Sequence, residues 1–185
     1  MNDLRLQKYT VKKGDTLWKI ASLYQVGVTE LINANPQIPD PDLIYIGQVV
    51  NIPAGSTYRD MEQEIIRLVN QERQNRGLSP LSENWEISRV ARIKSQDMID
   101  YNYFSHNSPV YGTPFKMLSD FGIKFTQAAE NIASGQTSAQ QVMNSWMNSS
   151  GHRANILNSN FNQIGVGVAR ASNGTYYFTQ IFIRS

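Results

Sequence analysis

Apolar and polar positions follow two different plans along the chain, one before residue 53 and one after residue 60. The first plan opens with a β-prone run at residues 9–12 that ends near Gly14. Apolar side chains then recur at helical spacing, with Asp15 placed as the cap: Leu17, Ile20, Ala21 and Tyr24. A second short helix precedes Asn35-Pro36, and a closing strand is expected over residues 48–52. This pattern predicts a β-α-α-β unit with paired terminal strands and both helices on one face.

The second plan begins with four helical patterns. Apolar stripes predict helices over residues 61–76 and about 85–101. A third helix is expected from Thr113-Pro114, where threonine caps and proline occupies the first turn. A fourth follows a capping box that opens at Ser138.

The end of the chain changes to a period of two. Apolar residues alternate with glycines over 164–168, and a β-prone run covers residues 175–183. The Asn173-Gly174 pair between them is typical of a hairpin turn. Helices followed by an antiparallel hairpin indicate an α+β layered domain.

These plans divide the chain into four parts. Residues 1–8 are expected to be an N-terminal tail, 9–53 a first domain, 54–59 a linker and 60–185 a second domain. The linker opens with small and polar residues after a proline, which is a normal domain boundary.

Composition excludes several classes of protein. The 185 residues are 41% hydrophobic and 17% charged with a net charge of +2, so no basic footprint for nucleic acid is present. The chain has no cysteine, so no disulfide supports the fold. No apolar run approaches the roughly 20 residues of a transmembrane helix. The first residues lack the basic and apolar regions of a signal peptide, so we expect none in this chain.

The first domain resembles a known carbohydrate-binding module. Its motifs are the run of residues 9–17, Ile20-Ala21, Asn35-Pro36 and the run of residues 43–48. From end to end, residues 9–53 resemble the LysM module, whose members bind polymers of N-acetylglucosamine such as peptidoglycan and chitin. The resemblance implies a groove between two loops, with Gly14, Asp15, Thr16 and Leu17 on one wall and Asn35, Pro36, Gln37 and Ile38 on the other.

The residue types suit that ligand. Backbone groups of two irregular loops can pair with the amide of an N-acetyl group, while Leu17 and Ile38 are expected to contact its methyl and the sugar face. Taken singly, Asp15 and Thr16 are equally explained as helix caps, and Pro36 as a helix stop. One shallow groove predicts modest affinity unless chains cluster.

The candidate chemistry of the second domain rests on the two histidines of the chain, His106 and His152, both in loop-like contexts. Glu130 lies between them in sequence. Each residue alone is more often structural than catalytic, and residues this far apart meet only if the fold brings them together.

A second resemblance joins these residues. The motifs are Leu68-Val69-Asn70 with Arg73, the runs of residues 103–106 and 129–133, Trp146 with the run 150–153, and the runs 164–167 and 178–180. Residues 65–185 resemble the CAP superfamily in its compact, disulfide-free bacterial form, which implies an α-β-α layered domain. Its eukaryotic members carry two histidines and two acids in a cleft. His106, Glu130 and His152 match three of those positions, and Ser149 stands where the second acid is expected.

The resemblance implies a metal site of two imidazoles, His106 and His152. Because structural and catalytic zinc sites use at least three protein ligands, we expect only weak, partly occupied binding of Zn²⁺ or another divalent ion, and no required cofactor.

These observations favour a protein of the cell wall, the extracellular space or the spore envelope that binds peptidoglycan through its first domain. The absence of cysteine and of a signal peptide leans toward a spore coat or cortex. Two alternatives for the function of the second domain stay open.

One alternative is a metal-assisted hydrolase of peptides or peptidoglycan with His106, Glu130 and His152 as catalytic residues. The other is carriage of a lipid or small molecule. The sequence does not set the oligomeric state.

Overall fold

The computed structural model describes residues 7–53 and 58–185, and the chain divides into two compact units, Met1–Thr57 and Tyr58–Ser185. Residues 1–6 of the expected tail and 54–57 of the expected linker lie outside the described residues. The expected boundaries of the two domains therefore fall within a few residues of the division between the units.

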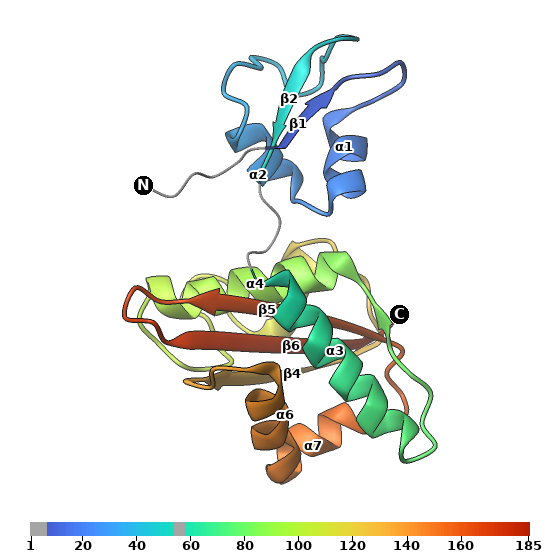
Figure 1. Ribbon diagram of the computed structural model, residues 1–185, viewed down its shortest axis with the longest axis vertical. Helices are drawn as coiled ribbons and strands as arrows, with labels where there is room; N and C mark the ends of the chain where they lie inside the picture. The colour runs from blue at the N-terminus through green and yellow to red at the C-terminus, as the bar shows by residue number, and fades with distance from the viewer. Residues whose placement is uncertain (1–6, 54–57) are drawn as a thin grey trace. The chain divides into compact units, whose positions relative to one another are not determined.

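The first unit has the predicted β-α-α-β order (Figure 1). It consists of β1 (Gln7–Thr10), α1 (Leu17–Tyr24), α2 (Val28–Asn33) and β2 (Val49–Ile52). The two strands pair antiparallel, from Gln7 opposite Ile52 to Thr10 opposite Val49. This pairing places residues 7 and 8 in β1, although they were expected to belong to the N-terminal tail.

The turn before α1 is held by two side chains with different roles. The Thr16 hydroxyl accepts from the backbone N–H of Lys19, so Thr16, and not Asp15, caps the helix. The Asp15 carboxylate instead accepts from the Tyr9 hydroxyl and the Lys12 N–H, each at 2.7 Å. Asp15 thus fixes the loop onto β1, which corrects the cap that the sequence indicated.

One small core holds the first unit together. Its buried side chains come from both helices, both loops and β2: Val11, Leu17, Ile20, Ala21, Val26, Leu31, Ile38, Val50 and Ile52. Asn35, 1% exposed, donates to the carbonyls of Leu31 and Asn51 and accepts from the Asn51 N–H, each at 2.7 Å. These bonds tie the end of α2 to β2 and satisfy backbone groups that would otherwise be buried without partners.

The second unit contains six helices and strands that the sequence indicated and three that it did not. The indicated elements are α3 (Arg59–Gln74), α4 (Trp85–Asp100), α5 (Pro114–Asp120), α6 (Ala139–Asn148), β5 (Gln163–Arg170) and β6 (Tyr176–Arg184). The others are β3 (Ser82–Glu83), β4 (Gln127–Ser134) and α7 (Ser150–Ile156). Because α3 begins at Arg59, the end of the expected linker belongs to the helix.

The strands form one sheet in the order β3-β5-β6-β4. β5 and β6 form the predicted antiparallel hairpin, β4 pairs antiparallel with β6, and β3 pairs parallel with β5. β4 is therefore an edge strand although it runs the length of the sheet.

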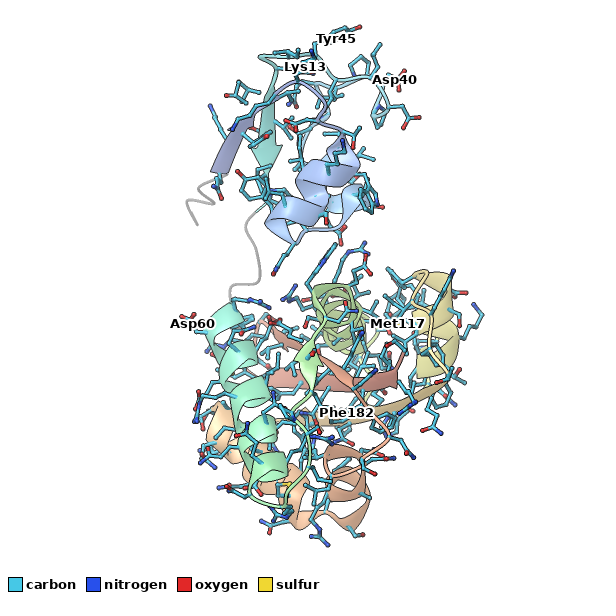
Figure 2. The ribbon with its side chains drawn as sticks, turned by 90° about the vertical axis from the view of Figure 1, so that its right-hand side faces the viewer. Lys13, Asp40, Tyr45, Asp60, Met117 and Phe182 are labelled. Carbon is cyan, nitrogen blue, oxygen red and sulfur yellow. The ribbon has the colours of Figure 1, made fainter. Side chains whose placement is uncertain are left out.

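Helices cover both faces of this sheet, as the α-β-α expectation required (Figure 1). Side chains of α3, α6 and α7 share one core with Ile164, Val166 and Phe182 of the hairpin. Side chains of α4 and α5 share a second core with Ile181 and Ile183. Successive residues of β6 thus face opposite layers, and Phe182 and Met117 of α5 mark the two cores in Figure 2.

Two glycines of β5 let α4 approach the sheet closely. A Cβ on Gly167 would lie 2.0 Å from the backbone nitrogen of Arg92, and one on Gly165 would lie 2.4 Å from the backbone of Ile87. The closeness allows the Ser95 hydroxyl to bond the Gly167 carbonyl at 3.0 Å and the Thr179 hydroxyl at 2.8 Å. The alternating glycines of the sequence are therefore a packing requirement of the helix on the strand.

We expect Gly167→Ala to destabilise the second unit by about 2 kcal/mol or more, because the added methyl displaces helix backbone and not a flexible side chain. Calorimetry of the full chain should show the transition of that unit at lower temperature. The matched control is Gly151→Ala on α7, whose added Cβ has no atom within 4 Å. Equal melting temperatures for the two variants would contradict this account.

Candidate functional site

His106 and Glu130 form a pair that joins a loop to the edge strand. His106 lies on the loop between α4 and α5, and its Nδ1 is 2.8 Å from Oε1 of Glu130 on β4. The Glu130 side chain is only 3% exposed, whereas that of His106 is 51% exposed. The Nδ1 edge of the imidazole is thus bonded to a buried carboxylate, while much of the ring is exposed to solvent.

The loop that carries His106 rests on a buried lysine. Lys94 of α4 is 1% exposed, and its ammonium donates to the carbonyls of Ser105 and His106 at 2.8 and 2.9 Å and to the Tyr103 hydroxyl at 2.8 Å. Three acceptors compensate the cost of burying this charge. The contacts fix the backbone at His106 itself.

A buried aspartate completes the support of the loop. Asp97, three residues after Lys94, accepts from the Tyr103 hydroxyl and from the Ser108 hydroxyl, the latter at 2.7 Å. Burial and the Asp97 hydrogen bond raise the pKa of Tyr103, so this phenol stays a donor. Lys94 and Asp97 were missed in the sequence, yet Lys94 falls on the apolar stripe of its helix, three residues after Ala91, and that position was the available signal.

His152 approaches the same strand from the other layer. It lies on α7, which corrects the loop-like context that the sequence indicated, and its carbonyl accepts from Nδ2 of Asn131 at 3.2 Å. Asn131 is fully buried, donates to Gln180 at 3.0 Å and accepts from Asn155 of α7 at 2.8 Å. Because successive strand residues face opposite sides, Glu130 faces the loop of His106 and Asn131 faces the helix of His152.

Burial shapes the acid–base properties of this site. It raises the pKa of Glu130, an effect that the His106 hydrogen bond and the charge of Lys94 oppose. Burial and then the charge of His106 lower the pKa of His152 from its ordinary value near 6.5, so His152 is neutral at pH 7. Glu130 Oε2 is buried and meets no hydrogen-bond partner within the described residues. The three predicted residues are therefore brought to one strand, with one carboxylate oxygen unused.

The donor set fits a metal ion only partly. No three His, Cys, Asp or Glu side chains within residues 7–53 and 58–185 are arranged to hold one. Oε1 of Glu130 is already engaged by His106 Nδ1, and Ser149, with no carboxylate, precedes α7. Among these side chains, the two imidazoles remain as ligands, together with the Glu130 Oε2 oxygen, which is buried.

In the first unit, the eight predicted glycan-binding residues fall into two groups. Gly14, Thr16, Pro36 and Gln37 are exposed and Asp15 is half-buried. Leu17, Ile38 and Asn35 are 3%, 6% and 1% exposed, with both apolar side chains in the core. The expectation that Leu17 and Ile38 present apolar surface to a sugar is corrected, because burial in the core outweighs it.

The buried residues have a different part in the candidate groove. Leu17, the first residue of α1, and Ile38, on the loop after α2, enter one core, so the loop before α1 and the loop after α2 are anchored to the same interior. Gln37 donates to Oδ1 of Asn35 at 2.8 Å, which joins an exposed wall residue to a buried one. A large apolar side chain next to the first loop, that of Trp18, is 65% exposed, and the sequence pattern had not marked it as a binding residue.

Comparison with known proteins places both units in families. Residues 66–182 match the cysteine-rich secretory protein family, CAP, and residues 9–53 match the LysM domain. The described part of the chain has no helix long and apolar enough to span a membrane.

Bacterial relatives share the second unit or the first. The chain is 49% identical over 130 residues to the uncharacterized protein YkwD of Bacillus subtilis, covering 70% of this chain and 49% of the relative. The crystal structure of an extracellular protein containing an SCP domain from Bacillus anthracis aligns with a TM-score of 0.64 and 34% identity over 75% of this chain and 47% of that one. The spore coat assembly protein ExsA of Bacillus cereus is 44% identical over 50 residues, 27% of this chain and 8% of its own.

The chain spans about half the length of YkwD and of the Bacillus anthracis protein. The family match covers more than half of the chain, the sheet and helices have the layered arrangement of that fold, and a carbohydrate-binding LysM domain precedes them. The protein belongs to the CAP family, in a form that carries an N-terminal LysM domain.

Proposed function

We propose that this protein binds peptidoglycan of the cell wall or spore envelope through N-acetylglucosamine, and that the LysM domain is responsible. The observation that carries the proposal is the complete LysM unit, in which Leu17 at the start of α1 and Ile38 after α2 anchor the two exposed loops to one core. Relatedness to a protein named for spore coat assembly favours a spore envelope. The exposed loop groups that would contact sugar are Gly14, Thr16, Pro36 and Gln37, with Asp15 at their edge.

Residues 1–56 should sediment with insoluble peptidoglycan, whereas residues 57–185 should stay in solution, because the sugar-binding loops lie in the first unit. Sedimentation with purified sacculi, scored by gel, measures this directly. A second fragment that sediments as well as the first would contradict the assignment of binding to LysM.

A hydrolase is the second candidate function, and the unused oxygen of Glu130 favours it. A buried carboxylate with a raised pKa and one oxygen that has no hydrogen-bond partner among the described residues can accept a proton from a water that reaches it, while His106 holds the other oxygen. The substrate would be a peptide or peptidoglycan bond. His152, neutral at pH 7, would accept a hydrogen bond from the same water or from the leaving group.

If the site of Glu130 hydrolyses peptidoglycan, Glu130→Gln should lower the release of soluble fragments from sacculi by at least about a hundredfold, because the amide cannot accept the proton. Sedimentation of the protein with sacculi should be unchanged, since LysM is intact. Glu64→Gln, on the exposed surface of α3, is the matched control. Fragment release that persists in Glu130→Gln, or none from the unaltered chain, would sink the hydrolytic function and leave the binding function standing.

We further propose that Zn²⁺ binds weakly to His106 and His152, where it would act as a Lewis acid toward a bound carbonyl or water. Calorimetric titration of the unaltered chain should show weak saturable heat. His106→Ala and His152→Ala should each abolish it, and Ser149→Glu should strengthen it by adding the missing carboxylate. Saturable heat that survives both alanine substitutions would place the metal elsewhere.

A further inference from the structure

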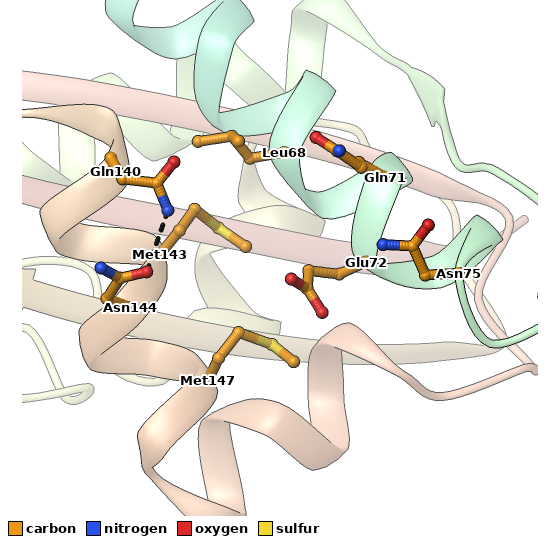
Figure 3. Close-up of a pocket in the computed structure, with 8 residues that line it drawn as sticks. All are labelled: Leu68, Gln71, Glu72, Asn75, Gln140, Met143, Asn144 and Met147. Atoms are coloured by element: carbon orange, nitrogen blue, oxygen red, sulfur yellow. Dashed lines mark hydrogen bonds between the residues drawn. The ribbon is translucent and has the colours of Figure 1, made fainter.

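A groove between α3 and α6 shares no lining residue with the His106 site and has a cavity volume of 210 Å³ (Figure 3). Three residues of α3 and its C-cap Asn75 are spaced i, i+3, i+4 and i+7 from Leu68, and four residues of α6 have the same spacing from Gln140. Residues at that spacing lie on one helical face, so two matched faces line the groove.

Carboxamides stand on both sides of this groove. Gln71 and the C-cap Asn75 come from the α3 side, and Gln140 and Asn144 come from α6. Gln140 donates to the Asn144 carboxamide oxygen at 2.9 Å, and the side chain of Asn75 makes no hydrogen bond to any residue that the structure describes. A carboxamide offers a donor and an acceptor together, which is the complement of a peptide amide.

The floor of the groove is apolar and adaptable. Leu68 and Met143 are 8% and 2% exposed, and Met147 is half-buried beside them. Thioether side chains adjust to irregular shapes and suit small groups such as the methyl of alanine. The cavity is smaller than the roughly 300 Å³ at which drug-sized pockets begin, so it admits a short segment.

Charge decides between ligand classes. Glu72 is the charged residue of the lining, and its Oε2 accepts from Arg76 in a pair whose side chains are 34% and 45% exposed. Such an exposed pair is weak and leaves Oε1 open to a second cation. Among the described residues, no lysine or arginine lines the groove, so the head group of a fatty acid would lack a counter-charge there, whereas a primary ammonium would gain one.

We propose that this groove binds the peptide stems of peptidoglycan, as a short segment of small residues whose primary ammonium pairs with Glu72. The identification of the peptide as peptidoglycan rests on the proposed wall-binding function. The contacts that would bind the peptide are made by the residues of the groove alone. The contact is too weak to sediment the second unit by itself, and it adds to LysM binding because both are on one chain.

The first test uses the blocked tripeptide acetyl-Ala-Lys-Ala-amide and the full chain labelled with ¹⁵N. Saturable shifts are expected for the side-chain amides of Gln71, Asn75 and Asn144. Glu72→Gln, or acetylation of the peptide lysine, should weaken binding about tenfold, because a hydrogen bond to a charged group is lost. Glu64→Gln is the matched control, since Glu64 also lies on α3 and pairs with an arginine, Arg67, and it should bind like the unaltered chain.

The second test separates the groove from LysM by comparing intact sacculi with glycan strands freed of their peptides by an amidase. Glu72→Gln should weaken binding of the full chain to intact sacculi and leave binding to bare strands unchanged. Failure of the unaltered chain to bind bare strands would contradict the LysM proposal but not the groove. Any of three results would overturn the groove proposal. Glu72→Gln and Glu64→Gln could bind intact sacculi equally well, the tripeptide could cause no shifts on α3 and α6, or palmitate could displace the tripeptide.

Discussion

The close packing of α4 on β5 is the constraint on which the candidate site depends. Gly165 and Gly167 remove the side chains that would hold the helix away from the strand, and Ser95 then bonds the sheet directly. With the helix seated at this depth, Lys94 is buried and its ammonium reaches the loop carbonyls at Ser105 and His106. A helix displaced outward would carry Lys94 with it, and the loop would lose its anchor. The geometry of His106 over Glu130 is therefore set by residues that touch neither side chain.

The edge strand β4 explains how two helical layers can serve one site. A central strand would be flanked by neighbours on both sides, but β4 pairs on one side with β6 and leaves the other open. Glu130 and Asn131 are adjacent and face opposite layers, so one receives the loop of His106 and the other the helix of His152. The hydrogen bonds of Glu130 and Asn131 cross from the sheet to both layers, which makes the arrangement costly to distort because a lost partner leaves a buried group unpaired.

The sequence predicted those elements whose local pattern and tertiary environment agree. The β5–β6 hairpin and the four helices α3 to α6 had clear periods, caps or turns, and they were found where expected. The strand β4 was not predicted, since its alanines and polar residues carry little β-propensity and pairing with β6 alone makes it a strand. Leu17 and Ile38 were assigned to the sugar because a motif does not say which way a side chain points. Lys94 was overlooked because its burial depends on a loop that lies more than ten residues further along the chain.

Both binding surfaces use groups that are individually weak. The LysM loops offer backbone and small polar groups, and the groove of α3 and α6 offers carboxamides around a single carboxylate. Neither buries an ion pair or a large aromatic anchor of the kind that dominates tight interfaces. Affinity for a repeating polymer does not require such an anchor. Once one site has bound the polymer, binding of the second site on the same chain is intramolecular and loses little further association entropy. A wall made of alternating sugar and peptide is a substrate on which two modest sites of different chemistry reinforce each other, and free sugar or free peptide would then be held much less tightly than the assembled polymer.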